Sequence, residues 1–310
     1  MTPPSLDVVI VNWNAGPQLA ACLASLAASR EASALKVIVV DNASSDGSVD
    51  GLDVPGLALS VIRNRENRGF AAACNQGAAA GRAEAILFLN PDTMVAPDSL
   101  VCARAALFAG SATGVVGARL VDEAGRTQRT CARTPTGIGL VAQTLFLDRL
   151  GLAGSHFMRD WDHESPRAVD AVMGAFLMIR RPLFEKLGGF DERFFVYWED
   201  ADLCTRVGRA GFALRHVAEA EVRHRGQGTT EAVKDRRLFY FLRAQALYAA
   251  KHHGPAVALA VLAAAILGQI PIRLARALLK RAPEDLGAVL RAELMLLQAL
   301  PGLLPRLFRA

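Results

Sequence analysis

Short runs of consecutive apolar residues recur in the first part of this chain, and several end at a polar residue. Three examples are Asp7–Asn12, Lys36–Asp41 and Ala85–Leu89; the first two finish on asparagine or aspartate, and Asn90 directly follows the third. A strand that is apolar throughout must be covered on both faces, which is typical of a parallel sheet between two layers of helices. Two further runs, Leu57–Ile62 and Val115–Ala118, are predicted to be strands of the same sheet.

Segments of helical composition separate these strands. They are Gln18–Ala28, Asn75–Ala80 and Ser99–Ala109. The alternation of strands and helices predicts an α/β fold, a sandwich with a mostly parallel central sheet. In such sheets ligands bind beyond the carboxyl ends of the strands. Asp41 and the turn at residues 90–92 follow strand ends, so they are candidate ligand contacts.

Charge and cysteine content narrow the classes of partner. The net charge of +5 and the pI near 9.2 suit an anionic partner such as a phosphate, a nucleotide or an acidic lipid surface. We expect no nucleic acid, because the arginines are dispersed and no zinc-finger spacing or long basic run occurs.

The five cysteines are scattered without any CxxC pair, which indicates buried thiols in a reducing compartment. Residues 1–6 lack the basic start and apolar run of a signal peptide, so a cytoplasmic location is expected.

The chemistry of the chain changes near residue 250. Pro255–Pro271 contains no charged residue, and four basic residues follow it on an amphipathic pattern before a second apolar segment, Leu286–Leu300. As a helix the charge-free run would be about 25 Å long, which is short of the ~30 Å hydrocarbon core. We therefore divide the chain into a catalytic domain, 1–250, and a helical region, 251–310, that lies on the inner face of the cell membrane. The alternative is a soluble hairpin packed on the catalytic domain or on a second subunit of a homo-oligomer.

The segment Gly188–Arg206 crowds five carboxylates among five aromatic rings within nineteen residues. Carboxylates repel one another and resist leaving water, so this arrangement is unfavourable unless a cation or a proton relieves it. A site that removes a proton from a substrate hydroxyl, or that holds a metal-bound phosphate, has a use for such groups. Glu199, Asp200 and Asp202 are the candidate bases. Asp202 has an alternative structural use, since it can pair with Arg206 at i,i+4 on a helix.

Three polar segments have a functional and a structural interpretation each. Residues 41–48 can receive a base or ribose through Asp41, or form an ordinary strand-to-helix turn. Residues 64–77 bring the backbone close to a phosphate at Gly69, or form a small-residue helix packed on the sheet. Asp92 can ligate a divalent cation that also holds a diphosphate, or cap the next helix.

Taken together, these segments resemble a known family. Seven motifs occur in order: VxIVNWN, DNASxDGS, ENRGFAxACNxG, FLNPDT, GAFLMIRR, GGFDERFFVYWEDxDLCxR and VRHRGQGT. They look like those of the family 2 inverting glycosyltransferases, and within that family like the branch of rhamnosyltransferases of cell-envelope polysaccharide assembly. The resemblance covers about residues 7–230. It implies the GT-A fold, a nucleotide-binding α/β sandwich.

The resemblance implies roles for individual residues. Asp200 matches the catalytic base, with Glu199 as its rival. Asp92 matches the last acid of the metal-binding DxD motif. His224 matches a histidine that completes the coordination of Mg²⁺ or Mn²⁺. Asn90 stands where the motif has its first acid, so the chain has one fewer anionic ligand. The residues matched to the nucleotide sugar are Asn12, Asn14, Asp41, Asn67, Arg68, Gly69, Asn75, Asn90 and Asp92, and those matched to the sugar and acceptor pocket are Gly174, Ala175, Phe176, Tyr197 and Trp198.

The implied reaction is inverting, metal-dependent transfer of a sugar, in the first place rhamnose or another deoxyhexose, from a dTDP- or UDP-sugar. The acceptor would be a glycan or a polyprenyl-linked sugar, and residues 125–170 would form a flap over it. Alternatives are another hexosyl donor and a catalytically silent nucleotide-sugar-binding partner protein. A processive synthase is disfavoured because the chain has no QxxRW motif. A dinucleotide-dependent oxidoreductase is disfavoured because the first strand-to-helix turn lacks GxGxxG.

Overall fold

A computed structural model describes residues 6–150, 156–226 and 233–309 of the chain. These residues form two compact units. Unit 1 comprises the described residues of 1–133, 157–192 and 199–229, and unit 2 those of 134–156, 193–198 and 230–310. The expected division into a catalytic domain, 1–250, and a membrane-associated or packing region, 251–310, stays a prediction.

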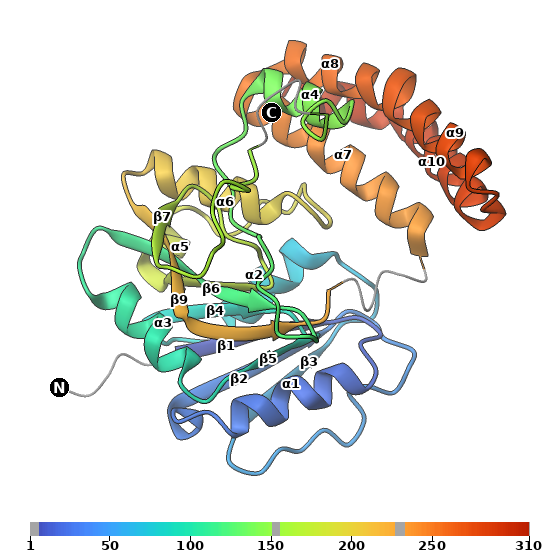
Figure 1. Cartoon of the computed structure of the whole chain (residues 1–310). Helices are drawn as coiled ribbons and strands as arrows, with labels where there is room; N and C mark the ends of the chain where they lie inside the picture. The colour runs from blue at the N-terminus through green and yellow to red at the C-terminus, as the bar shows by residue number, and fades with distance from the viewer. Residues whose placement is uncertain (1–5, 151–155, 227–232, 310) are drawn as a thin grey trace. The chain divides into compact units, whose positions relative to one another are not determined.

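Unit 1 is built on one sheet of nine strands (Figure 1). Along one path the strand order is β3-β2-β1-β4-β8-β6-β9-β5, and β7 pairs with β9. The first four strands of this path are parallel, and β8 runs antiparallel between β4 and β6. The strands are β1 (Leu6–Asn12), β2 (Leu35–Asp41), β3 (Ala58–Arg63), β4 (Ala85–Leu89), β5 (Thr93–Val95), β6 (Thr113–Val121), β7 (Arg167–Val169), β8 (Phe176–Arg180) and β9 (Ala213–His224).

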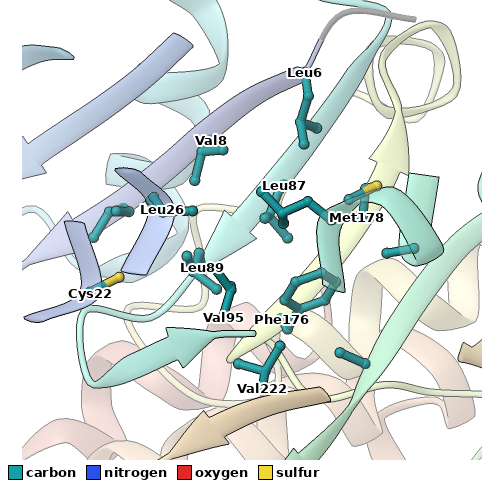
Figure 2. Packing of buried hydrophobic residues seen from close by; sticks show 14 of the residues in the cluster. Leu6, Val8, Cys22, Leu26, Leu87, Leu89, Val95, Phe176, Met178 and Val222 are labelled. Carbon is teal, nitrogen blue, oxygen red and sulfur yellow. The ribbon is translucent and has the colours of Figure 1, made fainter. Parts of the chain in front are cut away.

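Helices cover both faces of this sheet, as the apolar strands require. On one face α1 and α3 pack against side chains such as Val8 and Leu87, and Figure 2 shows this core reaching Phe176 and Val222. On the other face α2, α5 and α6 pack against side chains that include Phe88. The helices are α1 (Pro17–Ala27), α2 (Phe70–Ala79), α3 (Ser99–Phe108), α5 (Arg181–Lys186) and α6 (Glu199–Arg209), and a short 3₁₀ turn, η1 (Ala32–Ala34), precedes β2.

Helix α2 lies unusually close to the sheet. A Cβ atom added at Gly77 would lie 2.4 Å from Cγ1 of Val9, so only glycine fits there. The helix begins directly after Gly69, whose φ of 85° favours glycine. It therefore starts five residues before Asn75, the expected first residue, because the alanines of its first turn pack on the sheet.

Unit 2 is helical. Helices α7 to α10 lie side by side in orange to red in Figure 1, and α4 packs on α7 and α8. Within the described residues of segment 125–170, which is expected to form a flap, lie helix α4 of unit 2 and strand β7 of unit 1. The helices are α4 (Gly137–Thr144), α7 (Lys234–His253), α8 (Pro255–Ala264), α9 (Ile270–Leu279) and α10 (Pro283–Leu307), with a π-helical segment, η3 (Ala265–Gln269), joining α8 to α9.

Candidate active site

The first two strands end side by side at polar residues. Asn12 and Asp41 are paired in register, and the Asn12 Nδ2 group donates a 2.8 Å hydrogen bond to Oδ1 of Asp41. Both side chains are buried, at 0% and 4% exposure. The Oδ1 atom of Asn12 is buried and has no hydrogen-bond partner among the residues that the structure describes. This edge therefore keeps an acceptor for a ligand donor.

Hydrogen bonds tie the loops after β1 and β2 to each other. Ser44 Oγ donates to Asp41 at 2.6 Å and accepts from the Asn14 backbone N–H at 2.9 Å. In return, Ser45 N–H donates to Oδ1 of Asn14 at 2.8 Å, and Gly16 N–H donates to Asp46 at 2.7 Å. The loops are thus held in place without a ligand.

A second polar cluster holds the turn before α2. The Asn67 side chain accepts a 2.9 Å hydrogen bond from Gly69 N–H, and Asn42 Nδ2 donates to the Gly69 carbonyl at 3.0 Å. Asn42 in turn accepts from Asn64. Arg68 is exposed beside this turn. The contacts of Asn42 and Asn64 were not predicted from the sequence. Asn42 directly follows the strand end at Asp41, and this position could have indicated a residue near the site.

Asn75 makes contacts of a different kind from those expected. Its Nδ2 group donates to the Phe190 carbonyl at 2.9 Å and to Glu192 at 3.0 Å, while its Oδ1 accepts from Phe190 N–H at 2.9 Å. A Cβ atom added at Gly189 would lie 2.6 Å from this oxygen. Asn75 thus fastens α2 to the turn at residues 189–192. Its contact with a nucleotide stays a prediction.

Asp92 and His224 face each other beyond the end of β4. The Nε2 atom of His224 lies 3.6 Å from Oδ2 of Asp92, and both side chains are less than one tenth exposed. The pairing of β5 with β9 places Thr93 opposite His224 and so fixes this proximity. Burial lowers the pKa of His224, while the Asp92 charge opposes that shift, so the imidazole is favoured in its neutral form.

Gln128 determines which nitrogen of the His224 ring carries the proton. Its Nε2 group donates to the His224 carbonyl at 2.9 Å, which turns its Oε1 atom toward Nδ1 of the ring at 3.1 Å. The proton of a neutral ring is then on Nδ1, and the lone pair of Nε2 faces the Asp92 carboxylate. Nothing in the sequence singled out Gln128 for this role.

Two acceptors this close repel each other unless a cation lies between them. Neutral imidazole and carboxylate are ligands that Mn²⁺ and Mg²⁺ accept. Asn90 adds no charge, and within the described residues no group of three His, Cys, Asp or Glu side chains gathers around a metal-sized space. The pair therefore fits a cation whose remaining ligands come from a substrate diphosphate or water.

Asp200 lies in the first turn of α6. Its Oδ2 accepts a 2.9 Å hydrogen bond from Gly174 N–H, and the next carbonyl, that of Ala175, accepts from Asn90 N–H at 3.1 Å. Asp200 is thus linked to the sheet edge that carries Asp92. Burial raises the pKa of Asp200, although hydrogen bonds from Gly174 and Ala201 oppose the shift. A carboxylate with a raised pKa and a fixed orientation suits a general base.

Glu199 and Asp202 differ from Asp200 in their surroundings. Glu199 is 6% exposed, and its Oε2 atom has no hydrogen-bond partner in the described part of the chain. Burial, followed by the charge of Asp200, raises the pKa of Glu199 well above its ordinary value, which favours a neutral acid. Asp202 accepts a 2.8 Å hydrogen bond from Arg206, so the expected i,i+4 pair is confirmed.

The expected sugar pocket residues fall in both units. Gly174, Ala175 and Phe176 belong to unit 1, where Ala175 and Phe176 are buried beside the end of β4. Tyr197 and Trp198 belong to unit 2 and have φ angles of 69° and 67°, which non-glycine residues rarely adopt. In unit 2 the Trp198 ring lies 4.9 Å from that of Tyr248. The Gln227, Gly228 and Thr229 part of the last motif lies outside the described residues.

The sequence of the chain matches one family model. Residues 7–188 match the family described as Glycosyl transferase family 2. The match covers more than half of the 310 residues, so the chain belongs to this family of glycosyltransferases. The expected family membership is confirmed.

Relatives and solved structures extend the comparison. The chain is 30% identical over 232 residues to the N-acetylglucosaminyl-diphospho-decaprenol L-rhamnosyltransferase of Mycobacterium tuberculosis, covering 71% of this chain and 75% of the relative. A mannosyltransferase from Pyrobaculum calidifontis, solved with GDP-Man and Mn²⁺, has a TM-score of 0.58 at 19% identity over 96% of this chain and 88% of its own. S. aureus TarS 1-349, solved with UDP-GlcNAc, gives 0.55 at 17% identity over 98% and 84%. These likenesses confirm the expected fold, and the rhamnosyltransferase supports the expected branch.

Proposed function

We propose that this glycosyltransferase transfers a deoxyhexose, in the first place rhamnose, from a dTDP- or UDP-sugar to a polyprenyl-linked or other glycan acceptor. The process served would be cell-envelope polysaccharide synthesis. The name of the mycobacterial relative supports both the transferred sugar and the lipid diphosphate of the acceptor. Another hexosyl donor is the alternative within the same chemistry.

The observation that carries the proposal is the position of Asp200. It is the half-buried carboxylate that the Gly174 N–H orients, at the same sheet edge as Asp92 and His224. In the proposed step Asp200 takes the proton of the acceptor hydroxyl while that oxygen forms a bond to the anomeric carbon. The bond to the nucleotide diphosphate breaks on the opposite face and its electron pair leaves with the diphosphate. One such displacement inverts the anomeric configuration and needs one base.

Asp92 and His224 would hold a divalent cation, Mg²⁺ or Mn²⁺. When bound, the cation neutralises charge on the departing diphosphate. Asn12, Asn14 and Asp41 would bind the base and ribose. The turn at Asn67, Arg68 and Gly69 would lie at the phosphates, which Arg68 and the first backbone amides of α2 would face. Gly174, Ala175 and Phe176 of unit 1 would form the floor beneath the sugar.

A location at the cytoplasmic face of the membrane follows from the proposed lipid-linked acceptor. Two segments of the described chain, Pro255–Leu279 and Pro283–Leu307, are long and apolar enough to cross a membrane, which is a weak indication taken alone.

A screen of nucleotide sugars tests the proposal. Purified protein is incubated with dTDP-rhamnose, UDP-GlcNAc or GDP-mannose, with and without Mn²⁺, and product formation on a polyprenyl-diphosphate sugar is followed by mass spectrometry. We expect transfer from dTDP-rhamnose with Mn²⁺ and inversion of the anomeric centre by NMR. Transfer from another donor alone would overturn the rhamnose assignment, and retention of configuration would overturn the single-displacement mechanism.

A catalytically silent binding protein is the second candidate. It is favoured only by Asn90, which replaces an acid of the metal motif. A silent protein would be stabilised by a nucleotide sugar in thermal unfolding but would form no product. Product formation that depends on Asp200 rules it out.

A further inference from the structure

The helices of unit 2 expose a large apolar surface. The segment Pro255–Leu279 is 25 residues long, and only 33% of its most apolar window is buried; for Pro283–Leu307 the share is 28%. A core helix of a soluble protein would be mostly buried. These helices therefore have an inner side that packs within unit 2 and an outer side that lacks a partner in this chain's described residues.

The outer side is marked by large aliphatic and aromatic side chains. On η3 and α9, Leu267, Leu278 and Leu279 are 79%, 62% and 86% exposed. Leu294 of α10 is 55% exposed, and Phe308, directly after the last residue of α10, is 64% exposed. The exposed apolar residues 290, 294, 297 and 304 of α10 and the C-cap residue 308 are spaced by three, four or seven positions. These spacings place them along one side of the helix. We call these exposed side chains the outer apolar surface.

On the α9 side of this surface the charge has one sign. The chain from Gly254 to Ala282 contains no acidic residue, whereas Arg276, Lys280 and Arg281 are exposed there. A fourth cation, Arg273, is half-buried, with its guanidinium 5.3 Å from the centre of the Phe146 ring. Exposed leucines beside lysine and arginine are typical of a helix that lies in the interface of an anionic membrane.

Polar contacts within unit 2 argue against a spanning hairpin. Lys234 forms a 2.8 Å ion pair with Asp285, and Arg291 forms one of 2.7 Å with Asp235, so α10 is tied to the polar first turn of α7. Crossing a bilayer would bring these charges toward hydrocarbon, where they are unfavourable. Lying on the surface leaves both pairs in water.

A second copy of the chain is a weaker fit. A two-fold contact centred on α9 would bring Arg276 and Lys280 near their own copies, and like charges repel. Anionic headgroups remove this repulsion instead. The charge pattern therefore favours lipid over self-association.

We propose that the outer apolar surface inserts in plane into an anionic bilayer, with Arg276, Lys280 and Arg281 at the headgroups. This inference rests on the proposed function, because a lipid-linked acceptor would then reach the enzyme by diffusion within the membrane. It adds the binding mode and the residues that carry it.

Vesicle co-sedimentation tests the binding mode. The full-length protein is mixed with vesicles of phosphatidylcholine alone or with 30 mol% phosphatidylglycerol. We expect binding to the anionic vesicles that weakens with salt. Removing one basic residue should lower the partition coefficient about fivefold, so R276Q/K280Q should lower it about 25-fold. L278E/L279E should lower it at least about tenfold, because carboxylates would replace inserted leucines.

V101E serves as the matched control. Val101 is an exposed aliphatic residue of α3 in unit 1, at 37% exposure, and this variant should bind vesicles like the original protein. Equal binding of all variants, equal binding to neutral vesicles, or loss of binding through a salt-resistant dimer in light scattering would each overturn the proposal. Carbonate-resistant association would overturn the in-plane mode in favour of a span.

Activity on a short, water-soluble acceptor separates this inference from the proposed function. L278E/L279E should keep that activity within about twofold while losing transfer to an acceptor embedded in vesicles. If no variant, nor the original protein, transfers sugar to either acceptor while vesicle binding behaves as expected, the proposed function fails and the membrane inference stands.

Discussion

The backbone N–H of Gly174 donates a 2.9 Å hydrogen bond to Oδ2 of Asp200. The bond stabilises the charged form of a carboxylate whose burial favours the neutral form. These opposing effects leave Asp200 able to ionise while it is held in one orientation.

The pH dependence of the reaction should report Asp200. Burial raises the pKa of this group above its ordinary 3.8, and only the carboxylate can accept a proton, so kcat/KM should fall as the pH drops through that raised pKa. We expect D200N to lower kcat at least about 10³-fold while donor affinity stays within about threefold. Steady-state kinetics and calorimetric donor titration measure the two quantities.

E199Q is the matched control for that variant. Because burial favours a protonated Glu199, an amide of the same shape should preserve most of the activity and the acid limb of the profile. The reverse result, an active D200N and an inactive E199Q, would make Glu199 the base.

The Asp92 and His224 pair should set the metal requirement. With either side chain changed, in D92N or H224Q, one of the two facing acceptors is weakened, so the apparent Mn²⁺ affinity in the presence of nucleotide should fall about 10–100-fold. Calorimetric Mn²⁺ titration with bound UDP or dTDP measures it. Q128L should show a smaller loss of the same kind, because Gln128 orients the ring. Unchanged Mn²⁺ binding in D92N would refute the assignment.

Asn75 distinguishes positioning from nucleotide contact. N75D keeps the acceptor for Phe190 N–H but places a carboxylate against the Phe190 carbonyl and Glu192, so stability should fall by about 1–3 kcal/mol. If Asn75 only positions the turn, the donor KM should stay within about twofold, and adding E192Q should restore part of the stability. A donor KM raised more than tenfold at full stability would show a direct nucleotide contact. Urea unfolding and initial rates supply both readouts.

His216 should make stability depend on pH. Burial lowers its pKa to about 4, and the ring lies against Cys131, with Nδ1 and Sγ 3.5 Å apart. The unfolded chain, with an ordinary pKa of 6.5, binds the proton more readily, so this contribution is complete above pH 6.5 and is lost as the pH falls toward 4. The loss should reach up to about 3 kcal/mol. Urea unfolding between pH 4.5 and 7.5 measures how the free energy of unfolding changes with pH. This free energy should depend less on pH in H216Q than in the original protein, and an unchanged dependence would contradict the assignment.

The parallel half of the sheet could be predicted because its strands are apolar on both faces. That pattern arises from burial alone and needs no knowledge of distant partners. Strands β8 and β9 were missed as elements, although their motifs had been noted. Their pairing with β4 and β6 joins segments far apart in the chain, and β9 carries exposed residues among its buried ones instead of one apolar run.

Some residues of the candidate site could likewise be predicted from the sequence, and others could not. Asp41, Asp92 and Asp200 could be selected from their place at strand ends or in a crowded acidic segment. Gln128 could not, because its role depends on β6 and β9 lying together. The use of Asn75 to hold residues 189–192 likewise depends on a tertiary contact across more than one hundred residues.

The hydrogen bonds that join the loops after β1 and β2 affect the thermodynamics of the proposed donor binding. Hydrogen bonds of Asn14, Ser44 and Asp46 already fix the backbone at this part of the proposed nucleotide site. Nucleotide binding would therefore order little additional backbone there. The entropic penalty from this region should be small, and association should be rapid rather than gated by loop rearrangement.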